Sequence, residues 1–440
     1  MSCADRAKQS VTLYEAGDYA GAARAADQGL ADHPGDGGLW GMRVRSALAL
    51  GDAAAVEKAY SAYVAERGDD DRALLHDLAD ATVEQALVSP SARLQMRAIE
   101  TIEALEWQDF ADEVAHEMNS DDDRVAAAAA IAVLHGYAQA PQVADQMMHS
   151  ENPEARRIAL DGVGRKIGKL AVADIEKAAS DNDARVRAAA LRWLGTLHDT
   201  GAVAICTQRL HDDDAGVRAA AATALGRIGL GNLEEIGRQA LADHALAVRL
   251  AGVELLASAR AETALAALAD DSDPRVALAA AIAVKQTHPE LAAKAIERAA
   301  NDADWTTRAA AANELVAAVG KEGALPIARR LAGDKEAGVR IAAARVLAHA
   351  GDPEGARAVL AAALDSLQAA ADLAALGDAR GEAALSAAVR DLHRTPEQRA
   401  EAAAAHVTAH HVTPGLVAAL ADPNGLVRIE AAAALGTLAK

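Results

Sequence analysis

The chain has 440 residues, a formal net charge of −20 and a pI of about 5.1. The acidic residues are spread along the chain, so no basic half is present to hold nucleic acid, and we expect no nucleic-acid partner. Two cysteines exclude a disulfide framework and a cysteine-rich zinc site.

The first ten residues, MSCADRAKQS, contain no apolar segment of the kind found in signal peptides. This favours a cytoplasmic protein. The alternative is a periplasmic lipoprotein anchored at Cys3, because a cysteine after a small residue ahead of a folded domain resembles a lipoprotein cleavage point. The segment 125–144 lacks Asp, Glu, Lys and Arg but holds a proline, a glycine and a histidine. We therefore predict no transmembrane segment.

Residues 1–68 are expected to form two helical hairpins. The first has Gly17, Asp18 and Tyr19 at the turn between its helices and Pro34 at its end. The second has Gly51 and Asp52 at its turn, and half of the chain's aromatic residues lie in this part. These positions resemble tetratricopeptide repeats, which pack with large side chains. A boundary is expected near Gly68.

From residue 69 a pattern of about 31 residues recurs, and it is clearest in Asp212–Gly229. Val217, Ala220, Ala221, Ala224 and Leu225 of this stretch form one apolar stripe on a helix. The flanking aspartates suit a helix start, and Gly229 suits a helix end. A fixed period of this size indicates a solenoid. Positions equivalent to Val217 are Leu94, Val125, Ala155, Val186, Val248, Val276, Thr307, Val339 and Val427.

Two charged columns accompany the stripe. An arginine follows the anchor position, and an aspartate stands six residues before that arginine. The arginines are Arg156, Arg187, Arg218, Arg249, Arg308, Arg340, Arg399 and Arg428. The aspartates are Asp181, Asp212, Asp243, Asp302, Asp334 and Asp422.

Spacing, stripe and charged columns together resemble the HEAT repeat, in the short alanine-rich form of phycobilisome-lyase-like proteins. The resemblance implies an all-α fold, a right-handed α-solenoid of antiparallel helix pairs, with about 12 repeats in residues 69–440. It also implies that the aspartates and arginines pair along the stack as a structural ladder. We therefore expect Arg218→Ala to destabilise the protein by leaving Asp212 partly buried and unpaired.

The two parts are expected to form one continuous rod, because no Pro- or Gly-rich linker separates them. The repeats around residues 365–400 are the least regular, and a softer joint is expected there. The last helix carries Val427, Leu435 and Leu438 with no polar cap after it. We therefore expect weak self-association through the C-terminal end.

Motifs for catalysis or cofactors are not found. His406 and His410 are four residues apart with His411 next to them, but His406 falls at a core leucine position of the repeat and no cysteine or acid completes a metal site. The sequence has no phosphate-binding loop, nucleophile elbow or dinucleotide fingerprint. We predict a protein that is not an enzyme and binds neither cofactor nor metal.

The predicted function is a protein–protein interaction scaffold, with an unknown protein partner on the concave face. The second helices of HEAT pairs line that face, and the sixth residue after each anchor varies most in chemistry. From that column we predict partner-binding residues Arg192, Glu254, Asn313 and Arg345, with Trp305 at the groove edge. Alternatives are an accessory subunit of a bilin-lyase-like enzyme and, less in keeping with the charge, a nucleic-acid-binding HEAT protein.

Overall fold

Side-chain caps begin many of the helices in the computed structural model, which describes residues 3–439. Asp214 accepts a hydrogen bond from the backbone N–H of Val217 at 3.0 Å, and Asn152 accepts one from that of Glu154 at 3.0 Å. Such caps are each worth about 1 kcal/mol. At the other end of the first of these helices, Gly229 takes a left-handed φ of 75°. Within residues 3–439 the regular structure is entirely helical.

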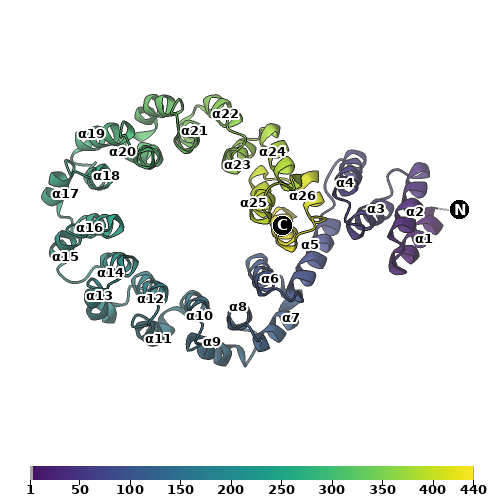
Figure 1. Cartoon of the computed structure of the whole chain (residues 1–440), viewed down its shortest axis with the longest axis horizontal. Coiled ribbons are helices and arrows are strands. Elements are labelled where there is room, and N and C mark those ends of the chain that lie inside the picture. The colour runs from purple at the N-terminus through teal and green to yellow at the C-terminus, as the bar shows by residue number, and fades with distance from the viewer. Residues whose placement is uncertain (1–2, 440) are drawn as a thin grey trace. The chain divides into compact units, whose positions relative to one another are not determined.

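The chain divides into two compact units, residues 111–359 and residues 1–110 with 360–440. The unit of residues 111–359 is a stack of helix pairs, whose helices lie in an inner and an outer row along an arc (Figure 1). Its helices are α7 (Ala111–His116), α8 (Asp123–Ala132), α9 (Ala140–Met148), α10 (Pro153–Lys166), α11 (Val172–Ala178), α12 (Ala184–Thr196), α13 (Val203–Arg209), α14 (Ala215–Ile228), α15 (Leu233–Ala240), α16 (Leu246–Ser258), α17 (Glu262–Leu268), α18 (Pro274–Ala283), α19 (Pro289–Ala300), α20 (Trp305–Leu331) and α21 (Ala337–Ala350).

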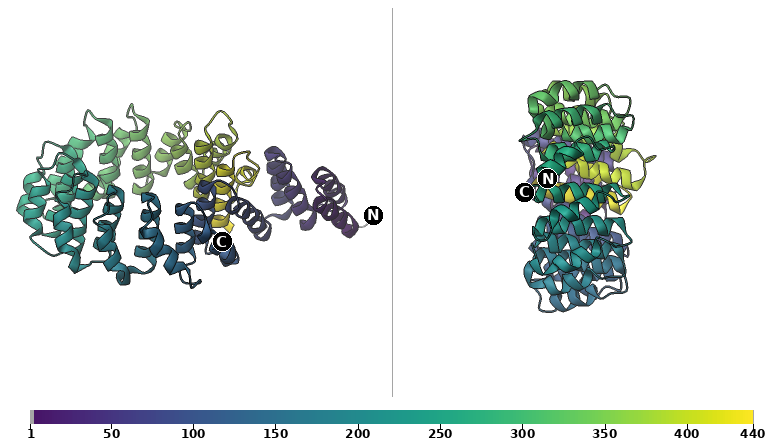
Figure 2. Two further views of the ribbon diagram at one scale, coloured as in Figure 1. Left: turned by 60° about the horizontal axis from the view of Figure 1, so that its bottom comes forward. Right: turned by 90° about the vertical axis from the view of Figure 1, so that its left-hand side faces the viewer.

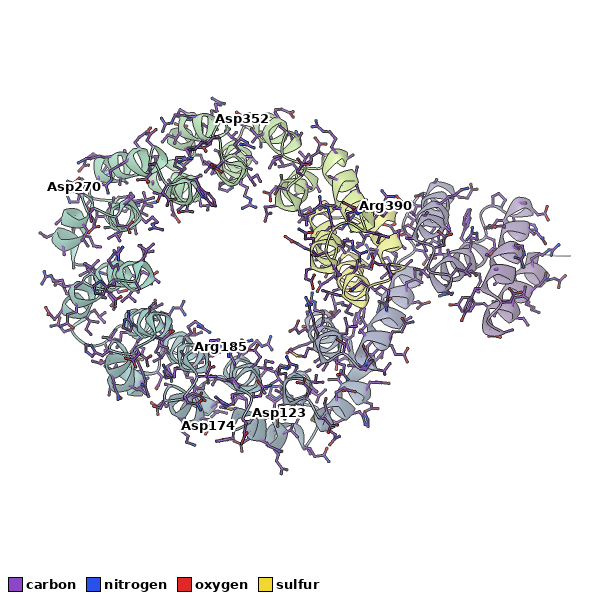
Figure 3. All side chains as sticks on the ribbon, viewed as in Figure 1. Asp123, Asp174, Arg185, Asp270, Asp352 and Arg390 are labelled. Carbon is purple, nitrogen blue, oxygen red and sulfur yellow. The ribbon has the colours of Figure 1, made fainter. Side chains whose placement is uncertain are left out.

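The inner row of this unit consists of the second helices of the pairs, among them α12, α14, α16 and α18 (Figure 1). Each of these helices packs against the next one, and Figure 2 shows the helices of this unit side by side along the stack. Asp174 of the outer helix α11 and Arg185 of the inner helix α12 mark the two rows in Figure 3. The helix α20 contains a break at Gly320, where φ is 73°, so its two parts contribute to different rows.

Alanine lets the helices of the stack approach closely. Val217, Ala221 and Leu225 of the predicted stripe are fully buried. A Cβ atom on Gly195 of α12 would lie only 2.7 Å from the Cα atom of Ala224 in α14. The small residues therefore allow backbone-to-backbone packing, which replaces the large aromatic core that the composition lacks.

The second unit combines the first six helices with the last ones. Its helices are α1 (Cys3–Glu15), α2 (Tyr19–Asp32), α3 (Gly37–Ala49), α4 (Ala53–Arg67), α5 (Arg72–Leu87), α6 (Ala92–Leu105), α23 (Leu367–Ala375), α24 (Ala379–Arg390), α25 (Pro396–Ala405), α26 (Pro414–Ala419) and α27 (Gly425–Ala439); α22 (Pro353–Ala361) crosses the division between the units. Helix α1 packs against α2, and α3 packs against α4. These four helices belong to the same compact unit as α5 and α6, and the boundary near Gly68 stays a prediction.

The last helix packs against the beginning of the chain, which corrects two expectations. Helix α27 lies against α25 on one side and against α5 and α6 on the other. Arg97 of α6 donates to both carboxylate oxygens of Glu430 in α27, at 2.5 and 2.8 Å. The prediction of a continuous rod is therefore wrong, because in a rod each pair touches only its neighbours.

The same contacts argue against self-association through the C-terminal end. Val427 and Leu435 of α27 are fully buried. A Cβ atom on Gly436 would lie 2.3 Å from Leu105 of α6, so these two helices are in intimate contact. The apolar face that was expected to bind a second molecule is covered by α5 and α6 of the same chain.

No helix within residues 3–439 is both long and apolar enough to cross a bilayer. Cys3, the proposed lipid anchor, is the first residue of α1, and its side chain lies outside the described residues.

Candidate functional site

The predicted partner-binding residues lie on helices of the inner row in the unit of residues 111–359. Arg192 is on α12, Glu254 on α16, Asn313 on α20 and Arg345 on α21, and all four are exposed. Thr223 of α14 donates a hydrogen bond to Glu254 at 3.4 Å. The column therefore lies away from the apolar stripe, on a surface that a partner can reach.

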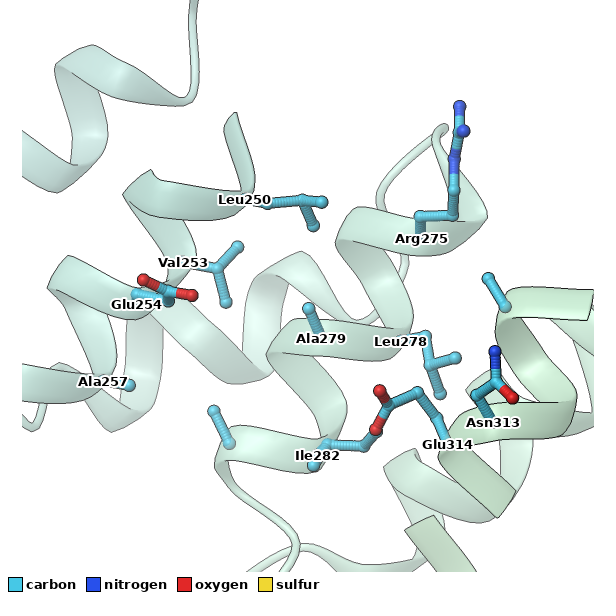
Figure 4. Close-up of a pocket in the computed structure, with 12 residues that line it drawn as sticks. Leu250, Val253, Glu254, Ala257, Arg275, Leu278, Ala279, Ile282, Asn313 and Glu314 are labelled. Atoms are coloured by element: carbon cyan, nitrogen blue, oxygen red, sulfur yellow. The ribbon is translucent and has the colours of Figure 1, made fainter. Parts of the chain in front are cut away.

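Two residues of this column meet in a groove across α16, α18 and α20 (Figure 4). Glu254 and Asn313 line it together with Ile282, the residue of the same column on α18. The groove has a volume of about 520 Å³, within the range of ordinary ligand sites. Arg192 and Arg345 do not line it, so the structure brings together only part of the predicted set.

The floor of the groove is apolar. Val253 and Leu278 are nearly buried, at 3% and 4% exposure, and Leu250 and Ile282 are half-buried beside them. These side chains come from three successive inner helices. A groove of this kind takes up apolar side chains of a ligand that crosses the stack.

Carboxylates flank this floor. Glu254 stands on α16 and Glu314 on α20, with Ala279 and Ile282 of α18 between them (Figure 4). The guanidinium of Arg275 is 3.3 Å from the carboxylate of Asp273, which Arg249 also contacts at 2.8 Å. Among the lining residues the two glutamates outnumber this one arginine. The groove therefore combines an apolar floor with an excess of negative charge, and it favours ligands that carry both apolar and basic groups.

Sequence reasoning missed Leu250 and Leu278, which stand two residues after their anchors. A signal was present: the spacing from Val248 to Val276 is 28 residues, three fewer than the usual period. Helix α18 is correspondingly short, with 10 residues against 13 in α16. A short helix between longer neighbours leaves space on the inner row.

Trp305, predicted at the groove edge, is 47% exposed but does not line the groove. It is the first residue of α20. Its ring lies over Gly338, where a Cβ atom would be 3.3 Å from it. Trp305 is thus an exposed aromatic residue that lies apart from Glu254 and Asn313.

The charged columns form a ladder with a fixed geometry. Arg308 donates through Nε and Nη2 to both carboxylate oxygens of Asp334, at 2.7 and 2.8 Å. Its Nη1 donates to the carbonyl oxygens of Asp302 and Ala303, at 2.9 and 3.0 Å. Each such arginine therefore binds the turn of its own repeat and the aspartate of the next one. The bidentate pairs are Arg156–Asp181, Arg187–Asp212, Arg218–Asp243 and Arg308–Asp334.

This geometry corrects the expected partner of Arg218. Its carboxylate partner is Asp243, at 2.7 and 2.9 Å, whereas Asp212 accepts from Arg187. Arg218 touches Asp212 only through the backbone carbonyl, at 2.9 Å. The hydrogen bonds from Arg218 hold the pKa of Asp243 below its ordinary value.

Other members of the columns depart from the pattern. Arg249 donates to Asp273 at 2.8 Å, in the short repeat. The carboxylate of Asp302 accepts from the backbone N–H of Asp304, at 2.8 Å. Arg340 and Arg428 donate to the carbonyl oxygens of their own turns, and within residues 3–439 no carboxylate accepts from either.

The rung from Arg399 to Asp422 is different again. Arg399 donates to Asp422 through Nη1 alone, and its buried Nε has no hydrogen-bond partner in the described part of the chain. The two side chains are only 6% and 5% exposed. Burial raises the pKa of Asp422 above its ordinary value.

Among the described residues, histidine and cysteine side chains do not gather into a site. His406 is fully buried, and its Nε2 lies 3.2 Å from the hydroxyl of Ser386. Burial lowers the pKa of this imidazole. Cys206 is buried as well, which raises the pKa of its thiol to about 12. Across residues 3–439, no group of three His, Cys, Asp or Glu side chains is placed to hold a metal ion.

Comparison with known proteins identifies the repeat. A family model for HEAT repeats matches residues 140–226, 172–257 and 292–386. These ranges include the groove helices α16 and α20 and most of the ladder. No curated protein matches the chain.

Several solved structures resemble it. The complex of CpcE and CpcF of phycocyanin lyase from Nostoc sp. PCC7120 is 24% identical, with a TM-score of 0.33; the match covers 51% of this chain and 94% of that one. Human deoxyhypusine hydroxylase in complex with glycerol is 22% identical, with a TM-score of 0.27 and coverage of 68% and 96%. Kap121p bound to RanGTP is 12% identical, with a TM-score of 0.32 and coverage of 88% and 51%.

Proposed function

This chain is a HEAT-repeat protein, and we propose that it is a non-catalytic scaffold that binds a protein segment in the groove across α16, α18 and α20. The observation that carries the proposal is the apolar floor of Leu250, Leu278 and Ile282 between two exposed glutamates. An accessible apolar surface of this kind on a soluble repeat protein needs a partner to cover it.

The charge of the groove specifies the chemistry of that partner. Glu254 and Glu314 attract basic side chains, and the net charge of −20 adds long-range attraction for a basic segment. We therefore propose that the ligand is a peptide segment with apolar side chains for the floor and Lys or Arg on either side of them. The groove residues include no nucleophile next to a base, so the proposed role is binding and not catalysis.

The test selects ligands from a displayed library of random 12-residue peptides on the full-length protein. Selected peptides are expected to combine Leu, Ile or Phe with Lys or Arg, and their affinity should fall as salt rises. The dissociation constant of one selected peptide is then measured by fluorescence anisotropy for wild type and variants.

The informative variant is Glu254→Lys with Glu314→Lys, which is expected to weaken binding at least tenfold. The matched control is Glu151→Lys with Glu322→Lys, which changes the net charge equally at two exposed residues outside the groove. If both variants weaken peptide binding equally, the loss of affinity comes from the change in net charge and not from the groove. Selected peptides without apolar or basic enrichment would overturn the proposal.

A further inference from the structure

Arg428 belongs to the ladder, but its Nε and Nη2 atoms, which bind a carboxylate in other repeats, donate to no carboxylate of the described chain. Arg428 of α27 donates through Nη1 to the carbonyl oxygens of Asp422 and Pro423, at 2.9 and 3.2 Å. Arg218 and Arg308 fix their own turns in the same way, with their Nη1 atoms. In those two repeats Nε and Nη2 then hold the aspartate of the next repeat.

The helix beside α27 explains why this edge lacks its carboxylate. In the stack of residues 111–359, the next repeat supplies the aspartate 25 or 26 residues after the arginine. Beside α27 lies α5, which comes from the beginning of the chain. None of its three acids accepts from Arg428: Asp77 accepts from Arg45 at 2.5 Å, one oxygen of Asp80 lies 3.1 Å from His76, and Glu84 is exposed.

Arg428 lines a cavity of about 620 Å³ within this unit. The walls come from the hairpins of residues 1–68, from α5 and from the turn before α27. Tyr14, Tyr19, Arg45 and Gln85 also line it, so several hydrogen-bond donors face the same space.

The balance of charge in this cavity is positive. Asp77 pairs with Arg45, and Asp422 pairs with Arg399, which leaves the guanidinium of Arg428 as the surplus charge. This local excess stands out in a chain of net charge −20. A guanidinium fork with two parallel donors matches a carboxylate better than any other common group in proteins.

We propose that this cavity binds a carboxylate, which completes the ladder at Arg428 by taking the place that an aspartate holds in the other repeats. The bound group forms two parallel hydrogen bonds with Nε and Nη2, and Arg45, Tyr14 and Gln85 contact the rest of the ligand. The carboxylate belongs either to an acidic side chain of a peptide or to a free small dicarboxylate. This site is independent of the groove on α16, α18 and α20.

The first experiment observes the arginine Nε–H signals of the full-length protein by NMR, with the Arg428 signal assigned from Arg428→Lys. The peptide probe is blocked Ala-Ser-Asp-Asn-Asp-Ala-Arg-Val, the sequence of residues 179–186, which contains the turn with Asp181. Its counterpart carries Asn in place of the first Asp. Succinate and inorganic phosphate are titrated separately.

The expected result is a saturable shift of the Arg428 signal with the Asp peptide or with succinate, and whichever of the two saturates at the lower concentration identifies the source. The Asn peptide should bind at least tenfold more weakly than the Asp peptide. Tighter binding of phosphate than of either carboxylate would overturn the proposal, as would an unmoved Arg428 signal at 10-millimolar probe, roughly the weakest affinity expected of a specific site.

Variants provide a second line of evidence. Arg428→Gln should weaken binding of the carboxylate probe at least tenfold. Arg340→Gln is the matched control, because Arg340 also donates only to its own turn, at 2.9 Å, but lines neither this cavity nor the groove. If Arg428→Gln does not fold, Arg428→Lys and the wild-type titrations still decide the question. Unchanged affinity in a folded Arg428→Gln protein would contradict the assignment.

Discussion

The rungs Arg308–Asp334 and Arg399–Asp422 show that the same residue pair gives two different interactions. Arg308 uses three nitrogen atoms, two on Asp334 and one on its own turn. Arg399 uses one nitrogen and leaves a buried Nε without a partner among the described residues. Accordingly the pKa of Asp334 is lowered by the hydrogen bonds from Arg308, whereas burial raises the pKa of Asp422. The identity of the pair alone therefore does not decide whether a rung is fully hydrogen-bonded.

The largest expected effect separates these two rungs by mutation. Arg308→Ala leaves Asp334 half-buried and without its partner, and it should lower the stability of the protein by about 3 kcal/mol. Asp422→Asn keeps an oxygen that can accept from Arg399 and removes a charge that burial disfavours, but it leaves the buried guanidinium without a counter-charge. Because these effects oppose each other, the net loss should be smaller than for Arg308→Ala, about 1–2 kcal/mol. Urea unfolding followed by circular dichroism measures both. A larger loss for Asp422→Asn than for Arg308→Ala would reverse the comparison.

A second test asks which aspartate each arginine stabilises. A double-mutant cycle of Arg218→Ala with Asp243→Ala should give a coupling energy of about 1–2 kcal/mol, because the two side chains share two hydrogen bonds. The cycle with Asp212→Ala serves as the control. It should be additive within about 0.5 kcal/mol, since Arg218 meets Asp212 only at its backbone carbonyl. Coupling to Asp212 and not to Asp243 would show that the rungs lie within repeats.

The smallest effect is a difference in pH dependence. Asp243 and Asp334 have lowered pKa values in the folded state. Their contribution to the stability of the fold is therefore fully present above the unfolded pKa of about 3.9, and it is lost as pH falls through the folded pKa. Asp422 has a raised pKa in the folded state, so its contribution to stability is fully present below the unfolded pKa of about 3.9. That contribution is lost as pH rises through the folded pKa.

The measurement compares urea midpoints of wild type, Asp334→Asn and Asp422→Asn between pH 3 and pH 7, a window of roughly the span in which carboxylates titrate. The stability deficit of Asp334→Asn should shrink toward acid pH. The stability of Asp422→Asn relative to wild type should rise toward neutral pH. Two variants with the same pH trend would contradict the opposite pKa shifts.

The repeats were predictable because they depend on local chemistry, whereas the contacts between distant repeats were not predictable. The stripe of Val217, Ala221 and Leu225 depends only on helical periodicity, and it is buried as predicted. The partner of Arg218 depends on the offset between repeats, which the sequence of one repeat does not contain. The packing of α27 on α5 joins helices from opposite ends of the chain, and no periodic signal records it.

The candidate groove was predictable only in part. Glu254 and Asn313 were found from the variable column, and the structure places both in the groove. Leu250 and Leu278 escaped because apolar residues in a repeat are normally assigned to the core. Arg192, Arg345 and Trp305 remain predicted binding residues outside the groove, since exposure alone does not define where a partner sits.

The contact between α5 and α27 also governs how this protein is made. Leu87 at the end of α5 and Gly425 at the start of α27 are separated by most of the chain. At about 5–20 residues per second, a ribosome needs on the order of 20–70 s to synthesise the intervening stretch. Throughout that time α5, whose buried side chains include Leu75, Leu78 and Val83, lacks the helix that later packs against it. The nascent chain therefore exposes an apolar helix face near its N-terminus during most of translation, which makes it a substrate for chaperones that bind such surfaces.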